Sequence, residues 1–466
     1  MKKNRLFKGI ALAAAVALCA GLAGGCSTKE NMEESGQVSL KVGDWLNKSE
    51  WPKEYALNEE RVNEMREKYP NITIIPDEWG YSTDSFLPSA ASGQIPDLYT
   101  VPFTEMPKIV KAGYAADLTE KFKEYGYDTA IKDSVLNSIE IDGKYYAIPF
   151  DGYIIGMMFN VELFKEAGLI DEKGRPIYPT NYDELRDTAV KIKEKTGKAG
   201  FSFPTVDAEG GWMLMSMAWS FGVDFMEQID GKWTATFDSP EMVNLMQYIS
   251  DLKWKYDVLP ENILLSRDDE YQLFATNQVA CMFAAGDWAD GIIRTYGMSK
   301  DNISNAPVPA GAAGACTQIG GKLYVIAPNA TEEQIDAAFK WISMKGQGME
   351  LSDSELERTE KDIKINQENG LVISNDEFSV FKDAKCIEQK KKIKEKYINV
   401  NPEIWNTMYS DKLILKSEEP VCAQELYRVL SPMLQEVLVN KNVDIPSMIK
   451  KANDNFQKDF LDKNAN

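Results

Sequence analysis

The chain has 466 residues, more than one hydrophobic core usually serves, and 44% of them are hydrophobic, as in a globular protein with two lobes or more. Histidine is absent, which excludes Ser-His-Asp and Cys-His catalysis and any metal site with histidine ligands. The net charge of −20 disfavours nucleic acid as a partner, because an acidic surface repels phosphates. We expect no nucleic-acid partner, no metal and no other cofactor.

The N-terminus has the form of a secretory signal. A basic cluster precedes the uncharged run 9–25, which is short for a membrane span. The run ends at Gly25-Cys26, a junction that resembles the signal of bacterial lipoproteins, in which the cysteine is diacylated. This resemblance implies a signal peptide over residues 1–25, a lipid on Cys26, and a location at the extracytoplasmic face of the cell membrane, held by the lipid alone. A plain signal peptide or an anchor helix is the alternative.

Strands and helices alternate along the chain after a polar tether over residues 26–37. This order predicts a parallel sheet covered by helices, hence an α/β fold. Segment 351–400 is dense in charge and is interpreted as a solvated helical excursion, with a partner-binding face as the alternative. The predicted strands are 38–42, 71–75 and 96–101, and the predicted helices are 54–69, 86–92, 183–195, 240–254 and 331–343.

Four cysteines besides Cys26 remain once the signal is removed, namely Cys281, Cys316, Cys386 and Cys422. Outside the cell they could form two disulfides, whose connectivity cannot be deduced from the sequence. Buried free thiols are the other possibility.

Five local patterns follow one another in a fixed order between residues 91 and 326. They are 91–98 (ASGQIPDL), 112–118 (AGYAADL), 142–149 (DGKYYAIP) with its continuation to residue 185, 274–288 (FATNQVACMFAAGDW) and 320–326 (GGKLYVI). Together they resemble the extracellular solute-binding proteins of bacterial ABC importers, in the class that serves oligosaccharide uptake. Asn277 and Cys281 depart from the pattern, which often has Gly and Ala there. The resemblance covers residues 38–345 and fades beyond residue 346.

The resemblance implies two α/β lobes, as in periplasmic binding proteins, with a ligand cleft between them. The N-terminal lobe is expected to comprise residues 38–150 and 312–345, and the C-terminal lobe residues 151–311 and 346–466. It also implies a monomer that is not an enzyme, and that captures a carbohydrate for the permease subunits of an ABC transporter.

The chain is expected to pass between the lobes at three places. These crossings are predicted near residues 150–151, 306–311 and 344–348, where proline and glycine reduce the number of obligatory ladder hydrogen bonds.

A sugar site needs aromatic platforms for its C–H faces and polar groups for its hydroxyls. Because ligands of α/β proteins bind beyond the carboxyl ends of strands, residues at such places are the candidates. By resemblance, Trp288 holds the family's commonest stacking position. Each of the aromatic candidates could instead belong to a hydrophobic core. The candidates are Trp288, Trp45, Asp151, Tyr153, Trp212, Asp287, Asp44, Phe103 and Trp405.

Two alternative functions stay open. A lipid-anchored glycoside hydrolase needs two suitably spaced carboxylates, and Asp and Glu are plentiful, although none of their groupings resembles a hydrolase motif. The same fold could also bind a peptide, a polyamine or a metal ion. A polyamine would need carboxylates in the cleft, and the absence of histidine weakens the metal version.

Overall fold

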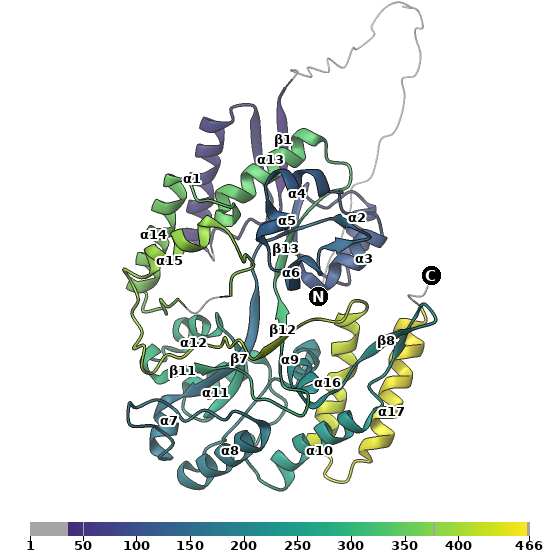
Figure 1. Ribbon diagram of the computed structural model, residues 1–466, viewed down its shortest axis with the longest axis vertical. Helices are drawn as coiled ribbons and strands as arrows, with labels where there is room; N and C mark the ends of the chain where they lie inside the picture. Colours follow the sequence, from purple (N-terminus) through teal and green to yellow (C-terminus); the bar gives the residue numbers. More distant parts are fainter. Residues whose placement is uncertain (1–35, 50, 376–377, 464–466) are drawn as a thin grey trace, which may run out of the picture. The chain divides into compact units, whose positions relative to one another are not determined.

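The computed structural model describes residues 36–49, 51–375 and 378–463 (Figure 1). The expected signal peptide, Cys26 and nearly all of the tether lie outside the described residues. Contacts between residues separate the chain up to Gln37 from a compact unit that begins at Val38. Both large sheets belong to this second unit. None of the described helices combines the length and the apolar character needed to cross a membrane.

The first sheet contains the strands predicted near the N-terminus. Its strand order is β2-β1-β3-β13-β6, in which β1 pairs in parallel with β2 and β3, and β13 is antiparallel to β3 and β6. The parallel arrangement predicted for the first three strands is thereby confirmed. The bounds are β1 (Val38–Val42), β2 (Ile72–Pro76), β3 (Leu98–Pro102), β6 (Ile148–Pro149) and β13 (Lys322–Ile326).

The second sheet is built around β7 and is mostly antiparallel. Its order is β10-β7-β12-β14, and β11 pairs with the C-terminal half of β7. β7 is antiparallel to β10, β11 and β12, whereas β12 and β14 are parallel. The bounds are β7 (Tyr153–Asn160), β10 (Cys281–Ala285), β11 (Ile303–Ala306), β12 (Ala315–Gly320) and β14 (Leu413–Ser417). Two hairpins pair β4 (Glu140–Ile141) with β5 (Lys144–Tyr145) and β8 (Met226–Ile229) with β9 (Lys232–Ala235).

The helices begin and end close to where local signals predict. For example, Ser239 caps α10, since its hydroxyl accepts a hydrogen bond from the Met242 N–H, and Pro240 fits the first helical turn, where no N–H is needed. The helices are α1 (Pro52–Lys68), α2 (Phe86–Ala91), α3 (Met106–Lys111), α4 (Thr119–Glu124), α5 (Tyr127–Ala130), α6 (Asp133–Leu136), α7 (Val161–Glu166), α8 (Tyr182–Thr196), α9 (Asp207–Phe221), α10 (Pro240–Trp254), α11 (Arg267–Ala275), α12 (Trp288–Tyr296), α13 (Glu332–Ile342), α14 (Asp353–Glu368), α15 (Lys385–Lys394), α16 (Ala423–Val439) and α17 (Ile445–Phe456).

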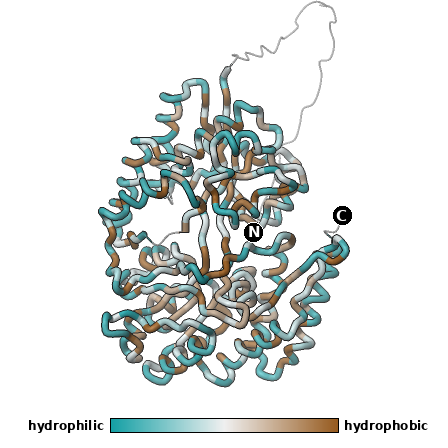
Figure 2. Tube along the Cα trace, viewed as in Figure 1, coloured by the Kyte–Doolittle hydropathy of each residue, from teal (hydrophilic) through white to brown (hydrophobic). Residues whose placement is uncertain are grey.

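Two large clusters of buried hydrophobic side chains accompany the two sheets. One includes Leu40 of β1 and Trp341 of α13, and the other includes Phe159 of β7 and Leu430 of α16. We call the sheet and cluster around β1 the first lobe, and those around β7 the second lobe. Hydrophobic residues, brown in Figure 2, concentrate along the central strands, whereas the outer helices are largely hydrophilic. The exact division of residues between the lobes stays a prediction.

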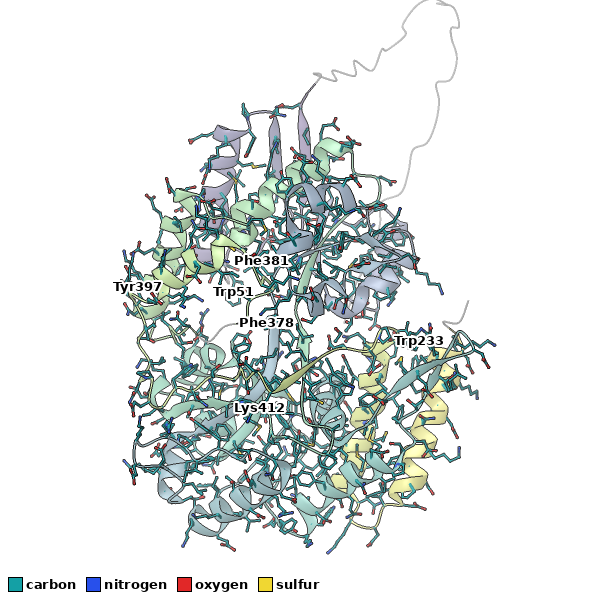
Figure 3. All side chains as sticks on the ribbon, in the orientation of Figure 1. Trp51, Trp233, Phe378, Phe381, Tyr397 and Lys412 are labelled. Carbon is teal, nitrogen blue, oxygen red and sulfur yellow. The ribbon has the colours of Figure 1, made fainter. Side chains whose placement is uncertain are left out.

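The chain passes between the two sheets at two closely apposed points, and it passes again between β13 and β14, since β14 pairs with β12. It leaves β6 of the first sheet through residues 150–152 to enter β7, as predicted, and it returns at Gly321, between β12 and β13. A Cβ on Gly321 would lie 2.2 Å from the carbonyl oxygen of Asp151, so only glycine allows the two backbones to pass this closely. Phe378, labelled in Figure 3, closes over the same point, since a Cβ on Gly152 would lie 2.9 Å from its ring.

The crossing predicted near residues 306–311 is wrong. β11, which ends at Ala306, and β12, which begins at Ala315, both pair with β7, so the intervening prolines connect two strands of one sheet. Proline marks a break in hydrogen bonding and does not determine which sheet the next strand joins.

The crossing predicted near residues 344–348 is also not found, because the chain stays with the first lobe beyond it. Leu351 and Cys386 belong to the first cluster, and an ion pair joins Arg358 of α14 to Glu64 of α1. Segment 351–400 is helical over α14 and α15, as predicted. Leu351 and Cys386 belong to the first cluster, whereas Leu371 belongs to the second, so the segment contacts both lobes.

No disulfide forms among the four described cysteines. Cys281, Cys316 and Cys386 are buried and Cys422 is half-buried, and none of the four forms a disulfide. Of the two possibilities left open by the sequence, the structure supports free thiols.

The close approach at Gly321 gives a stability prediction. Gly321→Ala should lower the free energy of unfolding by about 1–3 kcal/mol, because the added methyl group meets backbone atoms that cannot rotate away. Gly80→Ala is the matched control, since no atom lies within 4 Å of its added Cβ. Urea denaturation of both variants checks this. Equal stability of the two variants would show that the crossing adjusts freely.

Candidate functional site

One end of the second sheet gathers residues that are distant in sequence. Because β7 is antiparallel to β10 and β12, its first residues lie beside the last residues of those strands, as Tyr153 does beside Gly320. Asp287 and Trp288 follow directly after β10, and Asp151 precedes β7. The predicted residues of the crossing and of the fourth sequence pattern therefore meet at one edge.

Four aromatic rings form a cluster at this edge, which we call the aromatic site: Tyr153, Trp212, Tyr271 and Trp288. The Trp288 ring centroid lies 5.3 Å from that of Tyr271, at an interplanar angle of 67°, and 6.3 Å from that of Trp212, at 32°. Tyr153 meets Trp212 edge to face at 5.9 Å. These are the distances and angles at which aromatic rings attract one another.

The rings differ in exposure, which separates their roles. Trp288 is only 5% exposed, whereas Tyr153, Trp212 and Tyr271 are half-buried. The guanidinium of Arg267 lies 5.7 Å from the Trp288 ring and pairs with Glu209 at 3.1 Å. Trp288 is thus the most enclosed ring of the cluster, and Trp212 and Tyr153 keep part of their surface exposed.

Three carboxylates surround the aromatic site. The Asp151 Oδ1 accepts a hydrogen bond from the Lys322 N–H at 2.8 Å. The Glu418 Oε1 accepts hydrogen bonds from the Trp212 Nε1–H at 3.0 Å and from the Tyr427 hydroxyl at 2.5 Å. Glu418 thereby fixes the orientation of the Trp212 ring.

Asp151 and Asp287 are exposed and Glu418 is half-buried, and protein atoms around all three remove part of their water. This desolvation raises the pKa of Asp151 and Asp287 above the ordinary value for aspartate, and it raises the pKa of Glu418 to about 7. The negative charge of Asp287 also raises the pKa of Asp151.

The predicted residues Asp44 and Trp45 lie in the first lobe and are engaged there. Trp45 is 4% exposed and stacks on Trp341 at 5.6 Å and 14°. The Asp44 Oδ2 accepts a hydrogen bond from the Tyr324 hydroxyl at 2.7 Å and pairs with Lys345 at 3.2 Å. The stacking gives Trp45 the position of a core residue, and Asp44 is part of an internal ion pair.

Phe103 and Trp405 are also separate from the aromatic site. Phe103 is 5% exposed in the first cluster, and Trp405 is 9% exposed in the second. Among the described residues, no ring contact joins either of them to the four rings. Of the nine predicted ligand-binding residues, the structure thus brings together Trp288, Trp212, Tyr153, Asp151 and Asp287.

Two residues of the site carry no sequence signal. Tyr271 lies within α11, where a helical pattern gives no indication of a ligand, and Glu418 lies in a region without a recognisable motif. Only the hydrogen bond from Trp212 to Glu418 reveals the latter's role.

The first lobe approaches the second near this site. The Gln424 amide of α16 donates a hydrogen bond to the Thr104 hydroxyl at 3.3 Å, and Arg428 pairs with Asp84 at 3.3 Å. Thr104 neighbours Glu105, which is buried and accepts a hydrogen bond from the Tyr81 hydroxyl. Carboxylates of both lobes therefore lie close to α16.

No group of three or more potential metal ligands is found within the described ranges. Hollows along α14 are lined by charged side chains such as Glu360, Lys361 and Lys364, without an aromatic face. They lack the features of the aromatic site.

The family model described as "bacterial extracellular solute-binding protein" matches residues 49–344. The maltotriose-binding protein of Pyrococcus abyssi is 22% identical over 59% of this chain and 55% of its own length. A solute-binding protein of Thermotoga lettingae bound to α-D-tagatose superposes with a TM-score of 0.62 at 19% identity, covering 91% of this chain and 98% of its own. UgpB of Mycobacterium tuberculosis with glycerophosphocholine gives 0.63 at 17% identity, covering 92% and 99%. The two-lobed, periplasmic-binding-protein-like fold predicted from the sequence is confirmed.

Glu270 is a buried carboxylate next to Tyr271. Its Oε1 accepts a hydrogen bond from the Ser202 hydroxyl at 2.7 Å, whereas its Oε2 has no partner, and the residue is 0% exposed. Burial raises the pKa of Glu270 to about 8. Between the ordinary glutamate pKa and this value, the folded protein binds a proton that the unfolded chain has lost, so Glu270 makes the protein less stable as pH rises.

Glu270→Gln should therefore stabilise the protein in a pH-dependent way. The amide keeps the shape and the bond from Ser202 but cannot ionise, so the gain should be small at about pH 5 and on the order of 2 kcal/mol or more at about pH 8. Urea denaturation at both pH values, with the exposed Glu357→Gln as control, measures it. A gain that is the same at both pH values would contradict the assignment.

Proposed function

The chain belongs to the family of bacterial extracellular solute-binding proteins, and from this membership we propose that its aromatic site captures a carbohydrate, an oligosaccharide in particular, which the protein delivers as a monomer to the permease subunits of an ABC transporter. The family consists of binding proteins, and we infer that the aromatic site binds its ligand without catalysing a reaction.

The proposal rests on one observation, the half-buried rings of Trp212 and Tyr153 beside carboxylates. Pyranose rings offer flat C–H faces that pack on aromatic rings, and their hydroxyls donate to carboxylate oxygens. The Glu418 hydrogen bond fixes the Trp212 ring in advance, so binding does not have to order it.

The ligands of similar proteins support a carbohydrate ligand to different degrees. A maltotriose-binding relative and a tagatose-bound structure agree with a saccharide, whereas UgpB with glycerophosphocholine shows that the fold accommodates other ligands. The ligand class therefore rests on the chemistry of the aromatic site, and its test must include ligands that are not saccharides.

A glycoside hydrolase remains the second candidate because the pKa of Glu418 is raised to about 7, as in general acids of such enzymes. Incubation with oligosaccharides followed by an assay for reducing ends separates the two functions. New reducing ends that disappear in Glu418→Gln would establish hydrolysis and contradict the binding function.

Removing the Trp212 platform should weaken saccharide binding. Trp212→Ala should raise the dissociation constant about thirtyfold, corresponding to roughly 2 kcal/mol for a central aromatic contact. Calorimetric titration with maltotriose, cellotriose and chitotriose, and with glycerophosphocholine, spermidine and a tripeptide, identifies the ligand class and measures the change.

The matched control is Trp254→Ala, the same truncation elsewhere in the second lobe. The Trp254 Nε1–H donates to the Val437 carbonyl at 2.9 Å, so its loss should lower the melting temperature and leave the affinity within about twofold. If Trp254→Ala weakened binding as much as Trp212→Ala, the effect would be one of stability alone. Binding of only the non-saccharides would refute the carbohydrate assignment.

We also propose that the protein is a lipoprotein held at the extracytoplasmic face of the membrane through Cys26. The basic cluster, the uncharged run 9–25 and the Gly25-Cys26 junction support this proposal. Its acidic surface is held away from anionic headgroups while the lipid tethers it.

Cys26→Ser should move the protein out of the membrane fraction, because the hydroxyl of serine cannot form the thioether to the lipid. Fractionation of cells that express each form, with detection by antibody, measures the shift. The Cys19→Ser variant serves as control, since Cys19 lies inside the expected signal and should be removed with it. Equal membrane retention of the Cys26→Ser protein would show that another segment anchors it.

A further inference from the structure

The carboxylates of the aromatic site have no cationic partner in direct contact. Asp151, Asp287 and Glu418 take part in no ion pair within the described part of the chain, and the hydrogen bonds that they accept come from a backbone N–H, an indole and a phenol. Each keeps at least one oxygen that accepts no hydrogen bond from a described residue. Asp151 and Asp287 are exposed and Glu418 is half-buried, so a ligand that covers them must compensate the charge that they carry.

Negative charge from all three carboxylates acts on one ring. The charges of Glu418, Asp151 and Asp287 all raise the pKa of the Tyr153 phenol, which lies at the start of β7. Negative charge is therefore concentrated at the exposed edge of the aromatic site.

The first lobe adds a further carboxylate from the opposite side. Glu105 is near enough for its charge to raise the pKa of Glu418, and its own pKa is raised by burial and by Glu425 of α16. Its contacts are the Tyr81 hydroxyl and Lys108, which lies 3.8 Å away. The first lobe therefore adds to the negative charge that acts on Glu418, although Glu105 itself is buried and pairs with Lys108.

Two cations lie near the site, and neither neutralises it. Arg267 is committed to Glu209 and to the Trp288 ring. Lys322 lowers the pKa of Asp151 and Asp287 from a distance, but its exposed side chain makes no ion pair with either carboxylate. The imbalance of charge in the site therefore remains.

A neutral sugar would leave these charges uncompensated, whereas a protonated amine would compensate them. An ammonium group has three N–H donors for the free carboxylate oxygens, and the faces of Trp212 and Tyr153 attract cations. We propose that the ligand is a saccharide that carries at least one protonated amino group, held among Asp151, Asp287, Glu418 and the face of Trp212. This inference rests on the proposed carbohydrate function and specifies its substrate class.

Pairs of saccharides that differ only in a hydroxyl or an amine test this inference. We would titrate the full chain, without its signal peptide, with maltotriose and cellotriose, and with their 2-amino-2-deoxy and 6-amino-6-deoxy forms, at neutral pH. In the best-bound pair the amine should bind at least about tenfold more tightly than the hydroxyl form, as expected for one new charge-assisted hydrogen bond. Added salt should reduce this ratio, because screening weakens ionic attraction.

Charge-neutral variants of similar shape locate the amine. Glu418→Gln and Asp287→Asn should each reduce the ratio of the two dissociation constants by about fivefold or more, since each removes a carboxylate with which an ammonium group can pair. Glu357→Gln, the same change on the exposed surface of α14, should leave the ratio within about twofold. A change of the ratio in the control as large as that in the site variants would overturn the placement of the amine.

The outcomes separate this inference from the proposed function. If the hydroxyl forms bind as tightly as the amine forms or more tightly, the carbohydrate function stands and the amine class is overturned. If no saccharide of either form binds, the carbohydrate function itself is contradicted. If spermidine binds and no saccharide does, the charge argument applies to a polyamine, and the saccharide assignment fails.

Discussion

The rest of the structure depends on the contact between the backbone of Gly321 and that of Asp151 and Gly152. At this point two segments pass between the sheets within van der Waals distance, and the approach leaves no room for a side chain on Gly321. The residues beside the crossing are also residues of the site, since the Lys322 N–H holds the Asp151 carboxylate and Tyr153 packs over Gly320. A change in the angle between the sheets would therefore move binding groups directly.

Burial divides the aromatic site into a support and a contact surface. Trp288 is enclosed by Tyr271, Trp212 and the Arg267 guanidinium, so its ring is fixed before a ligand arrives. Trp212 is held by its hydrogen bond to Glu418 and keeps part of its surface exposed. A platform ordered in this way loses little conformational entropy on binding, and more of the contact energy is available for affinity.

The sequence predicted those features that depend on local signals. The bounds of α10 follow from Ser239 and Pro240, and the pattern ending in Trp288 placed that residue and Asp287 at a strand end. It could not predict that Trp341, from a distant helix, covers Trp45, or that Glu418 meets Trp212, because both contacts arise only when separate segments pack. It misplaced the return crossing for the same reason, since strand pairing decides to which sheet β12 belongs.

The free thiols have a consequence for a protein that works outside the cytoplasm. Burial raises the pKa of Cys281, Cys316 and Cys386, so little of the reactive thiolate forms at any of the three positions. No disulfide joins these four described cysteines, so a reductant has no bond among them to break. The same fold should therefore form in oxidising and in reducing surroundings, including anaerobic ones.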